Sequence, residues 1–442
     1  MNPRVFKHCA EQLCHIFTVI LNWFLSVCQV PNQWKTSCII PVPKKKSVQS
    51  MNDLRPVALT SVCMKLFERL VLVKLVDVVK DFMDPYQFAY RDRRSVDDAV
   101  LFVLNKIYSH LEKPGTYIRL MFFDFSSAFN TIQPHLMAQK LVSMNVQPAT
   151  VLWIMDYLTH RPQYVRMKSN CTSDTICSNT GAPQGTVLSP FLFSLYTADC
   201  RSSSDSCSLT KFADDSGLTG QVTDGDETEY RREVDKFVGW CDDNFLGMNV
   251  SKTRELIIDF RKKGGVHDEV ILKGEVVETV EHYKYLGITL DNKLTWKQNT
   301  EALMKKLHSR LYFLRKLRSF NVNKDILQMF YNATCNSVLH FGSVCWGGGL
   351  CSQDRNRLEK FISKASGVVG RKQETFTSTH GRRVTDRLHK ILNDDTHPLR
   401  PEFDNRRTDR SDRFIVPRTR TTRYRQSFIP SAMHIFNSQL GR

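Results

Sequence analysis

The sequence is short of negative charge and of long apolar runs. It holds 45 Asp and Glu residues against 62 Lys and Arg, which gives a net charge of +17 at pH 7. Such a surplus favours a polyanionic partner, most directly nucleic acid, over a basic surface that only aids solubility. The one apolar stretch of note, Ile16–Val30, is interrupted by polar residues and favours a buried amphipathic helix over a membrane span. No cleavage pattern of a signal peptide follows it. We therefore expect a soluble, intracellular chain in the nucleus or cytoplasm, with no membrane partner.

Cysteine is present without any metal-binding or disulfide pattern. The 13 cysteines include no Cys-x-x-Cys pair, and the pairs Cys171/Cys177 and Cys345/Cys351 lack His partners at zinc-finger spacing. An odd number without regular spacing is typical of reduced thiols inside a cell. The sequence therefore argues against a zinc finger and against a disulfide framework.

Local patterns predict a mixed α/β chain. With 442 residues and 41% hydrophobic content, the chain has room for two to four structural units. Helical periodicity and capping residues predict helices over 1–30, Ser61–Asp81, Ser95–Leu111, most of Thr131–Leu158, Ser189–Ala198, Thr228–Asn244 and Leu307–Arg318. Apolar runs and alternation predict strands at Ser37–Val42, Ile118–Phe123, Gln163–Met167, Thr175–Asn179, Leu256–Arg261 and Val270–Glu275, the last two around the turn Lys262–Gly265.

The character of the chain changes near residues 290–295, where basic helices begin. We expect a first domain over 24–290, a basic helical region over 291–370 and a loosely ordered tail over 371–442. That tail holds 16 Lys and Arg against 8 Asp and Glu, which favours contact with nucleic acid. The alternative is a solvated basic tail without a specific partner.

Three aspartates stand in distinctive settings. Asp124 directly follows the apolar run Ile118–Phe123, and taken alone it is better explained as a helix N-cap. Asp214 and Asp215 are adjacent at the tip of a hairpin predicted over Ser208–Gly220, and alone an ordinary turn explains them. Neighbouring carboxylates repel each other unless a cation lies between them. Together the three form a candidate site for two metal ions, which would stabilise the attacking and leaving oxygens of an in-line displacement.

Ordered motifs around these aspartates resemble the active-site motifs of reverse transcriptases. In chain order they are Phe123-Asp124 through Ala128-Phe129, then Gly181–Gly185, then Phe212–Asp215. Flanking segments resemble the enzymes of non-LTR (LINE-type) retrotransposons, and the resemblance covers about residues 15–350. These segments are Val30-Pro31 with Trp34-Lys35, Ile40–Lys44, Arg55–Leu59, Gln87–Tyr90 with Arg94-Ser95, Asn249 with Lys252-Thr253, and Tyr285–Gly287.

The resemblance implies a right-hand polymerase fold of the α/β class. Fingers and palm are expected over 24–290 and a helical, basic thumb over 291–370. The chain is expected to be a truncated, element-derived copy, with no endonuclease domain before it and no RNase H carboxylates or Cys/His knuckle after it. Residues 293–322 also resemble a basic segment found at the N-termini of AlkB homologues. No oxygenase iron site is recognisable in the sequence, so we interpret this segment as part of the thumb.

The resemblance also implies a metal set and the acids of the reaction. Asp124, Asp214 and the backbone carbonyl of Phe125 are implied as ligands of two Mg²⁺ or Mn²⁺ ions. Asp215 is implied as a further ligand or a supporting acid near the primer terminus. Lys252 stands where such polymerases have a general acid for the pyrophosphate, and a structural lysine is an equal alternative.

A second set of residues is implied to hold the nucleotide. Phe129 matches the bulky residue that excludes a ribose 2′-hydroxyl, with a core aromatic as the alternative. Gln184 matches the residue that touches the incoming nucleotide and Gly185 lets the backbone come close, unless both belong to a plain turn. Arg55 matches a triphosphate contact, which an Arg can hold bidentately, whereas Lys44 is better explained as surface charge.

The implied function is an RNA-directed DNA polymerase that uses an RNA template, a DNA primer and dNTPs. Tyr285, Leu286 and Gly287 resemble the hairpin that supports the primer, although a core turn has the same pattern. The first alternative is a folded but inactive nucleic-acid-binding remnant of an element. A viral-type RNA-dependent RNA polymerase is disfavoured by Phe129 and by Ala213 ahead of the Asp pair. The departures Leu54 and Phe212, where aromatic residues and Tyr are common, remove no catalytic group.

Overall fold

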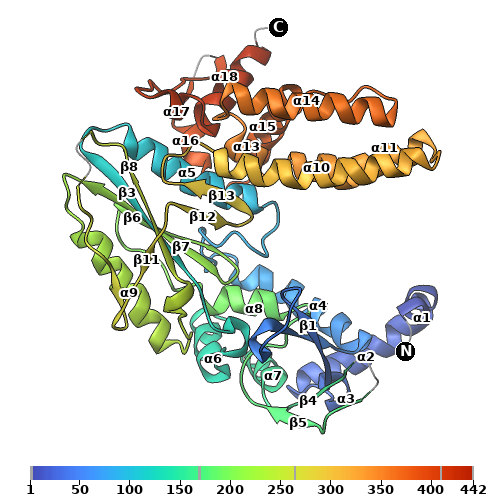
Figure 1. Ribbon diagram of the computed structural model, residues 1–442. Helices are drawn as coiled ribbons and strands as arrows, with labels where there is room; N and C mark the ends of the chain where they lie inside the picture. Colours follow the sequence, from blue (N-terminus) through green and yellow to red (C-terminus); the bar gives the residue numbers. More distant parts are fainter. Residues whose placement is uncertain (1–2, 168–170, 263–264, 409–410, 441–442) are drawn as a thin grey trace. The chain divides into compact units, whose positions relative to one another are not determined.

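The computed structural model describes residues 3–167, 171–262, 265–408 and 411–440 (Figure 1). Its contacts divide the chain into two compact units, each assembled from separate stretches of sequence. Unit 1 consists of Met1–Tyr90, Asp124–Arg201 and Asp235–Asn249, and unit 2 of Arg91–Phe123, Ser202–Val234 and Val250–Arg442. Among the helices of the described ranges, none is both long enough and apolar enough to cross a membrane.

Unit 1 contains a four-stranded sheet with the order β2-β1-β4-β5. Strand β1 (Ser37–Pro43) pairs antiparallel with β2 (Leu54–Leu59) and parallel with β4 (Arg161–Val165), which in turn pairs antiparallel with β5 (Ile176–Ser178). The strands predicted near residues 37, 163 and 175 are therefore confirmed.

Helices of unit 1 surround an aromatic core. Phe67 of α4 meets Trp153 of α7 edge-on at 4.7 Å between ring centroids, and Trp153 stacks on Tyr157 at 5.7 Å. All three rings are buried, so this cluster fixes α4 against α7. The helical elements are α1 (Pro3–His8), α2 (Ala10–Ser26), α3 (Asn32–Lys35), η1 (Met51–Asp53), α4 (Val62–Val79), η2 (Ala128–Asn130), α6 (Pro134–Ser143), α7 (Pro148–Leu158) and α8 (Ser189–Tyr196).

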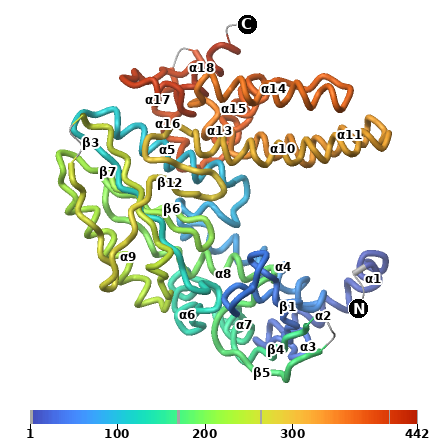
Figure 2. The backbone as a smooth tube through the Cα atoms, viewed as in Figure 1, coloured from blue at the N-terminus to red at the C-terminus, as the bar shows by residue number. Residues whose placement is uncertain are grey.

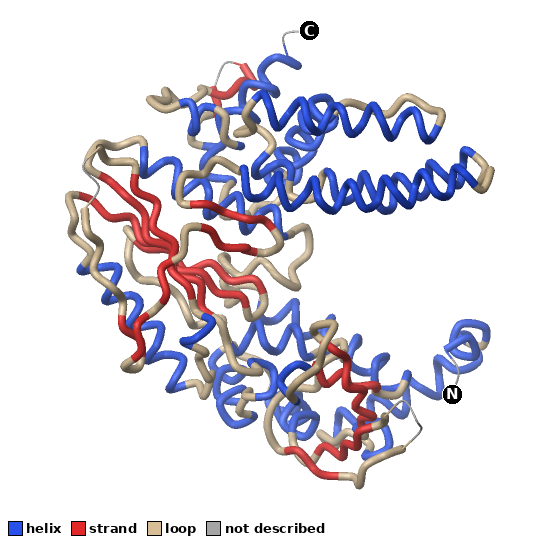
Figure 3. The backbone as a smooth tube through the Cα atoms, viewed as in Figure 1, coloured by secondary structure: helices blue, strands red, loops and turns tan. Residues whose placement is uncertain are grey.

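Unit 2 is built around a five-stranded sheet with the order β11-β8-β3-β7-β6, drawn red in Figure 3. The central strand β3 (Thr116–Phe123) is buried along its whole length and pairs antiparallel with both neighbours. The other strands are β6 (Cys207–Phe212), β7 (Asp215–Thr223), β8 (Arg254–Asp259) and β11 (Glu278–Thr279). Helix α9 (Thr228–Asp243) has its first residues in unit 2 and its last in unit 1.

Two expectations for this sheet need correction. The run Ile118–Phe123 is a buried strand, but it is not wholly apolar, because it contains the fully buried Arg119. The stretch Val270–Glu275 is not one strand. Left-handed Lys273 and Gly274 (φ +52° and +84°) break it into the hairpin of β9 (Ile271–Leu272) and β10 (Glu275–Val276). Positive φ at both central residues suits a tight two-residue turn, and the Gly adopts it without strain.

The expected pairing of the strands around Lys262–Gly265 is also wrong. Strand β8 pairs with β3 and β11, whereas β9 pairs with β10. Residues 263–264 of the predicted turn lie outside the described residues. Pairing with β3 and β11 places β8 inside the five-stranded sheet, with a hydrogen-bonded strand along each edge.

Helices dominate the rest of unit 2. Helix α5 (Val96–Leu111) begins with the predicted N-cap Ser95, which forms a reciprocal capping box with Asp98. The predicted basic helix near residue 307 is α10 (Lys297–Ser319), which lies beside α14 (Ser352–Val369) in Figures 1 and 2. Along the chain, α10 and α14 are separated by α11 (Lys324–Phe330), the π-helical turn η4 (Tyr331–Asn336), α12 (Ser337–Leu339) and α13 (Ser343–Trp346).

The interpretation of 371–442 as a loosely ordered tail is wrong for its described residues. They form α15 (Phe376–Leu392), α16 (Arg400–Asp404), β14 (Arg407–Thr408), β15 (Ser411–Phe414), α17 (Thr422–Arg425) and α18 (Phe428–Leu440). Val384, Leu388 and Ile391 are fully buried on one face of α15. Their spacing of four and three residues is helical, so the segment has an apolar face to bury despite its high charge.

Candidate functional site

The predicted hairpin with two adjacent aspartates is present in unit 2. Strands β6 and β7 are joined by the two residues Ala213 and Asp214, and Phe212 pairs with Asp215 across the turn. Ala213 adopts a left-handed conformation (φ +57°), which allows the chain to reverse. Both carboxylates, of Asp214 in the turn and Asp215 at the start of β7, are exposed.

Strand register sets which end of the sheet carries this turn. Phe123, the last residue of β3, pairs with Ser216, and Phe122 pairs with Gly217. The Asp-Asp turn therefore lies at the carboxyl end of β3. Asp124 is the next residue along the chain and belongs to unit 1. The peptide bond between Phe123 and Asp124 thus joins this end of the sheet to the third predicted acid.

In unit 1, the segment after Asp124 pairs with residues at the end of α9. Phe125 forms an antiparallel bridge with Met248, in which Asn249 donates to the Asp124 carbonyl (2.8 Å) and Ser126 donates to the Gly247 carbonyl (2.8 Å). These two bonds do not use the carbonyl of Phe125. Helical turn η2 begins after Ser127, so Asp124 is not its N-cap.

A glycine-containing loop of unit 1 brings predicted nucleotide contacts together. Gly181 has φ +72°, and a Cβ there would lie 2.7 Å from the Asn130 backbone, so only glycine fits. The N–H of Ala182 donates to the carbonyl of Phe129 (2.8 Å). The ring of Phe129 is half-buried and stacks on Phe193 at 4.8 Å between ring centroids. Because the Phe129 ring lies partly in the core, a core aromatic stays the alternative to a residue that contacts the nucleotide.

The same loop also binds strand β2, which carries Arg55. Ala58 donates to the Gln184 carbonyl (2.6 Å). Gly185 has φ +101°, which strains any other residue, and a Cβ there would lie 3.2 Å from the Ala58 carbonyl oxygen. Arg55 itself is exposed and pairs in register with Val42. A cleft of about 630 Å³ lies in this region of unit 1, lined by Gln184 and Asn130 among others. Gln184, Phe129 and β2 are therefore neighbours within one unit.

Lys44 follows β1 and is exposed. Its ammonium donates to the Asn52 carbonyl (3.0 Å), and its N–H donates to the Asp53 carbonyl (2.8 Å). The adjacent Lys45 pairs with Asp53 at 2.8 Å, and its hydrogen bond lowers the pKa of that carboxyl to about 2. Within unit 1 these contacts hold the basic loop in shape, in keeping with a surface role for Lys44.

A buried acid that the sequence patterns did not indicate supports the glycine-containing loop. Glu68 of α4 is fully buried and accepts hydrogen bonds from the N–H groups of Val187 (2.5 Å) and Leu188 (2.9 Å), just before α8. Burial raises the pKa of Glu68 to about 7, against the opposing effect of these two bonds. A lone Glu on the apolar face of a predicted helix was the only signal.

The predicted primer-support residues form a hairpin of unit 2. Strands β12 (His282–Tyr285) and β13 (Ile288–Asp291) are joined by Leu286 and Gly287, both left-handed. Tyr283 stacks on Phe122 of β3 at 4.1 Å, and the ring of Tyr285 lies 5.1 Å from the same side chain. Burial, together with the charge of Asp215, raises the pKa of Tyr285. The hairpin therefore packs on β3 at Phe122, one residue before the carboxyl end of that strand.

The last predicted site residue, Lys252, lies in the short helix η3 (Val250–Lys252) of unit 2, immediately before β8, and is exposed. Because β8 pairs with β3 through Arg254 and Phe122, Lys252 precedes the strand at the same end of the sheet as the Asp-Asp turn. Among the residues that the structure describes, no three His, Cys, Asp or Glu side chains are gathered closely enough to hold a metal ion.

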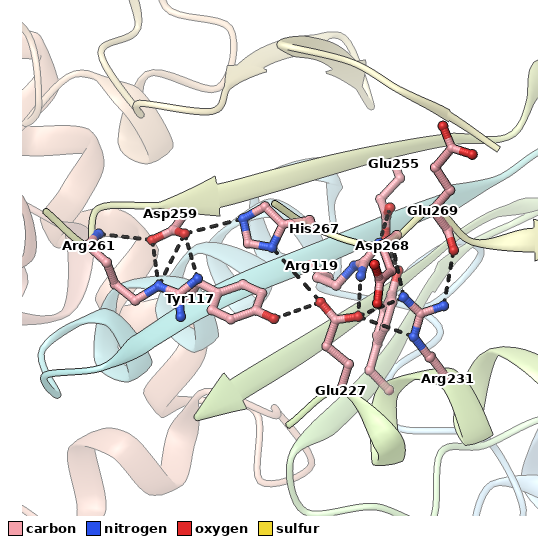
Figure 4. Close-up of polar contacts among 11 residues, drawn as sticks. Tyr117, Arg119, Glu227, Arg231, Glu255, Asp259, Arg261, His267, Asp268 and Glu269 are labelled. Atoms are coloured by element: carbon pink, nitrogen blue, oxygen red, sulfur yellow. Dashed lines mark hydrogen bonds and ion pairs between the residues drawn. The ribbon is translucent and has the colours of Figure 1, made fainter. Parts of the chain in front are cut away.

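A buried ionic network lies toward the other end of β3 (Figure 4). Arg119 donates to both oxygens of Glu255 on β8 (2.8 and 2.7 Å), and it also binds Glu227. Tyr230 of α9 donates to Glu255 at 2.6 Å, and Tyr117 donates to Glu227 at 2.6 Å. Burial opposes the ionisation of Glu227, but hydrogen bonds led by Arg119 hold its pKa at about 2.

This network locks three elements of unit 2 together. Arg119 and Glu255 both have fully buried side chains, so neither charge is solvated by water. A buried charge is tolerated only when its partners satisfy it, as they do for this pair. The signal in the sequence was a single Arg inside a run of apolar strand residues.

Comparison with known proteins places this geometry in context. Residues 42–290 match the family described as "Reverse transcriptase (RNA-dependent DNA polymerase)". Residues 296–337, from α10 to α12, match a segment described as "Alkylated DNA repair protein alkB homolog 8, N-terminal".

Three curated relatives are proteins of mobile elements of Drosophila melanogaster. The chain is 25% identical over 417 residues to a probable RNA-directed DNA polymerase from transposon BS, covering 87% of this chain and 46% of that protein. It is 26% identical over 327 residues to the RNA-directed DNA polymerase from mobile element jockey, covering 70% of this chain and 35% of that protein. It is 23% identical over 456 residues to a probable RNA-directed DNA polymerase from transposon X-element, covering 95% of this chain and 49% of that protein. The chain thus spans about half or less of the length of these relatives.

Among solved structures, apo telomerase from Candida tropicalis has a TM-score of 0.44 to this chain at 12% identity, covering 84% of this chain and 70% of that one. The chain belongs to the reverse transcriptase family and is related to the enzymes of non-LTR retrotransposons.

Proposed function

We propose that this chain is an RNA-directed DNA polymerase, which extends a primer 3′-hydroxyl with dNTPs on an RNA template. The observation that carries the proposal is the exposed pair Asp214 and Asp215, held in a tight turn at the carboxyl end of the buried strand β3. Because pairing between β6 and β7 fixes the backbone of the turn, only the two side chains need to be ordered when a ligand binds. Membership of the reverse transcriptase family supports the same activity.

Asp124 is proposed as the third carboxylate of the site. It is linked by one peptide bond to Phe123, whose strand partner Ser216 adjoins Asp215. The Phe125 carbonyl is proposed as a fourth oxygen donor, since the bridge to Met248 uses the groups on either side of it. Three carboxylates and one carbonyl make an all-oxygen donor set, the kind that Mg²⁺ and Mn²⁺ prefer.

Two bound divalent ions would neutralise charge that develops on the attacking and leaving oxygens of the phosphoryl transfer. Residues of the chain itself would position the incoming nucleotide. Gln184 and Arg55 are proposed to contact the base and triphosphate of the incoming nucleotide, since β2 and the loop of Gln184 are hydrogen-bonded neighbours. Phe129 is proposed to exclude a ribose 2′-hydroxyl. Lys252 is proposed as the proton donor to the leaving pyrophosphate.

The hairpin of Tyr285, Leu286 and Gly287 is proposed to support the primer strand. Its two aromatic residues pack on Phe122, the neighbour of the last β3 residue, so its turn is fixed relative to the Asp-Asp turn within unit 2. The domain division at residues 24–290, 291–370 and 371–442 stays a proposal alongside these roles. Compartment is likewise a proposal: nucleus, cytoplasm or both.

Primer extension by the purified chain tests the activity. We expect dNTP incorporation on a primed RNA template with Mg²⁺ or Mn²⁺ and none in EDTA. Binding of the primer-template without extension would instead support the alternative of an inactive nucleic-acid-binding remnant. Preferential use of rNTPs would contradict the assigned role of Phe129 and favour an RNA-dependent RNA polymerase.

A further inference from the structure

Helix α10 of unit 2 exposes a row of cations and aromatic rings with no acid among them. The helix has seven Lys and Arg residues, while its single acid, Glu301, is paired with Arg357 of α14 at 2.7 Å. Tyr312, Phe313 and Phe320, the last just beyond the helix end, are 62%, 53% and 67% exposed. The rings of Tyr312 and Phe313 lie 5.6 Å apart between centroids, so they form a contiguous apolar patch, the kind of surface that marks an interaction site.

Helical spacing places three of these side chains on one face. Lys306, Phe313 and Phe320 are seven residues apart, and Lys316 lies between the two rings, with its ammonium 5.2 Å from the centre of the Phe320 ring. Seven residues of helix span about 10.5 Å, or roughly three stacked nucleotides of one strand. Cations therefore alternate with rings at a pitch that suits a polynucleotide.

A cleft of about 550 Å³ opens beside this row, between α10 and the segment from α11 to the π-helical turn η4. Phe313, Leu317 and Phe330 give it apolar walls, and Arg310 and Lys316 lie on its lining. Arg310 also donates to the carbonyl of Thr334 in η4, which fixes the guanidinium at the cleft. An apolar slot with two cations suits a planar base that carries a phosphate.

We propose that this face of α10 is a stacking site for unpaired bases of a single-stranded nucleic acid. Exposed aromatic rings can stack on any base, and the surrounding cations bind the backbone phosphates without reading sequence. A duplex, whose bases are already stacked, gains nothing from the rings. The site lies entirely within unit 2 and needs neither the metal nor the nucleotide of the proposed polymerase reaction.

Binding of a dye-labelled single strand, followed by fluorescence anisotropy in EDTA without dNTPs, tests the site. Oligo(U) RNA and oligo(dT) DNA are compared with a duplex of the same length. For the Phe313→Ala/Phe320→Ala protein we expect single-strand affinity to fall by roughly tenfold or more, with duplex affinity nearly unchanged. Loss on oligo(U) alone or on oligo(dT) alone supports the site and identifies the strand.

Two further variants separate stacking from other effects. Phe313→Trp, which keeps a ring, should restore most of the affinity that Phe313→Ala loses. Trp23→Ala removes a ring of similar exposure (56%) from α2, a helix without Lys or Arg, and should leave binding unchanged. Unchanged single-strand binding in the double variant, or an equal loss on single strand and duplex, would overturn the proposal. The result is independent of whether the chain extends primers.

Discussion

Single buried charges decide much of the behaviour of this chain, and Glu68 is the plainest case. Its carboxyl group is fully buried on α4, yet two backbone N–H groups of the loop before α8 donate to it. The loop continues from Gly181–Gly185, the segment proposed to meet the nucleotide. Glu68 therefore connects the protonation of one side chain to the position of that loop.

We expect Glu68→Gln to change how the stability of the protein depends on pH. The raised pKa of about 7, against an ordinary 4.5, means that the folded chain binds an extra proton between these values. The stability from this group is complete below about pH 4.5 and is lost as pH rises through 7, by about 3 kcal/mol in total. Glutamine keeps an acceptor oxygen but cannot ionise.

Urea unfolding of both proteins at pH 5 and pH 8 measures this effect. The variant should gain stability relative to wild type on going from pH 5 to pH 8. Taking the difference between the two proteins cancels other titrating groups, such as His340 and His380, whose pKa values burial lowers to about 4. A difference that does not change with pH would contradict the assignment. Glu11→Gln, at an exposed position of α2 in the same unit, is the matched control.

Sequence patterns named the acids of the proposed site but not the buried charges that support the elements around it. Asp124, Asp214 and Asp215 stand in motifs with a fixed order, so their neighbourhood could be predicted. Glu68 and Arg119 have no motif, because a buried charge is specified by partners that are distant along the chain. Each appeared only as a polar residue in an apolar pattern, which by itself does not name its partner.

At the scale of elements, strand β3 connects the ionic network to the proposed site. Arg119 is held by Glu255 and Glu227 toward one end, and the strand ends at Phe123, beside the Asp-Asp turn. Central position, full burial and ion pairs on both sides make β3 a rigid support. The position of the Asp-Asp turn therefore depends on the ion pairs of Arg119, about four residues before the end of β3.

Arg119→Met should destabilise the protein by about 3–5 kcal/mol, because it leaves the carboxylate of Glu255 buried without its cation. The double variant Arg119→Met/Glu255→Met removes both charges and should recover much of this loss. Urea unfolding checks both values. Arg232→Met, which breaks an exposed pair with Glu229, is the control and should have little effect. If the single and double variants lose equal stability, burial of the unpaired acid is not the cause.

Most elements were predictable because their apolar spacing is regular. The cap of α5 at Ser95 and the turn between β6 and β7 followed from local residue types. Strand pairing around residues 262–265 was not predictable, because β8 pairs with β3, a strand more than 130 residues earlier in the chain, and not with the nearby strand β9. Tertiary contacts overrode a local turn signal at that point.

At the scale of the molecule, unit 2 joins the chain's C-terminal residues to α5. Arg387 of α15 binds Asp97 (3.0 Å) and Asp98 (2.9 Å) at the start of α5, and Arg94 binds Asp394 (2.8 Å). His397 lies 3.3 Å from Asp98, and both side chains are buried. High charge in this stretch led to the expectation of a solvated tail. Part of that charge instead forms buried pairs with partners some 290 residues earlier.

Arg387→Met should therefore destabilise unit 2 strongly, by about 3–5 kcal/mol, since two buried carboxylates lose their shared cation. Arg382→Met on the same helix breaks only an exposed pair with Glu374 and should cost well under 1 kcal/mol. Thermal unfolding with limited proteolysis compares the two. Equal stability of both variants would mean that the C-terminal helices do not depend on this contact.

Asp214 is proposed to serve catalysis and not folding. The measurement is primer extension on an RNA template by Asp214→Asn protein, with single-strand binding recorded on the same samples. Asp205→Asn, an exposed aspartate ahead of β6, is the matched control. We expect Asp214→Asn to lower the extension rate at least about a hundredfold while binding is retained, and the control to extend normally. Extension by Asp214→Asn at the wild-type rate would contradict this proposal.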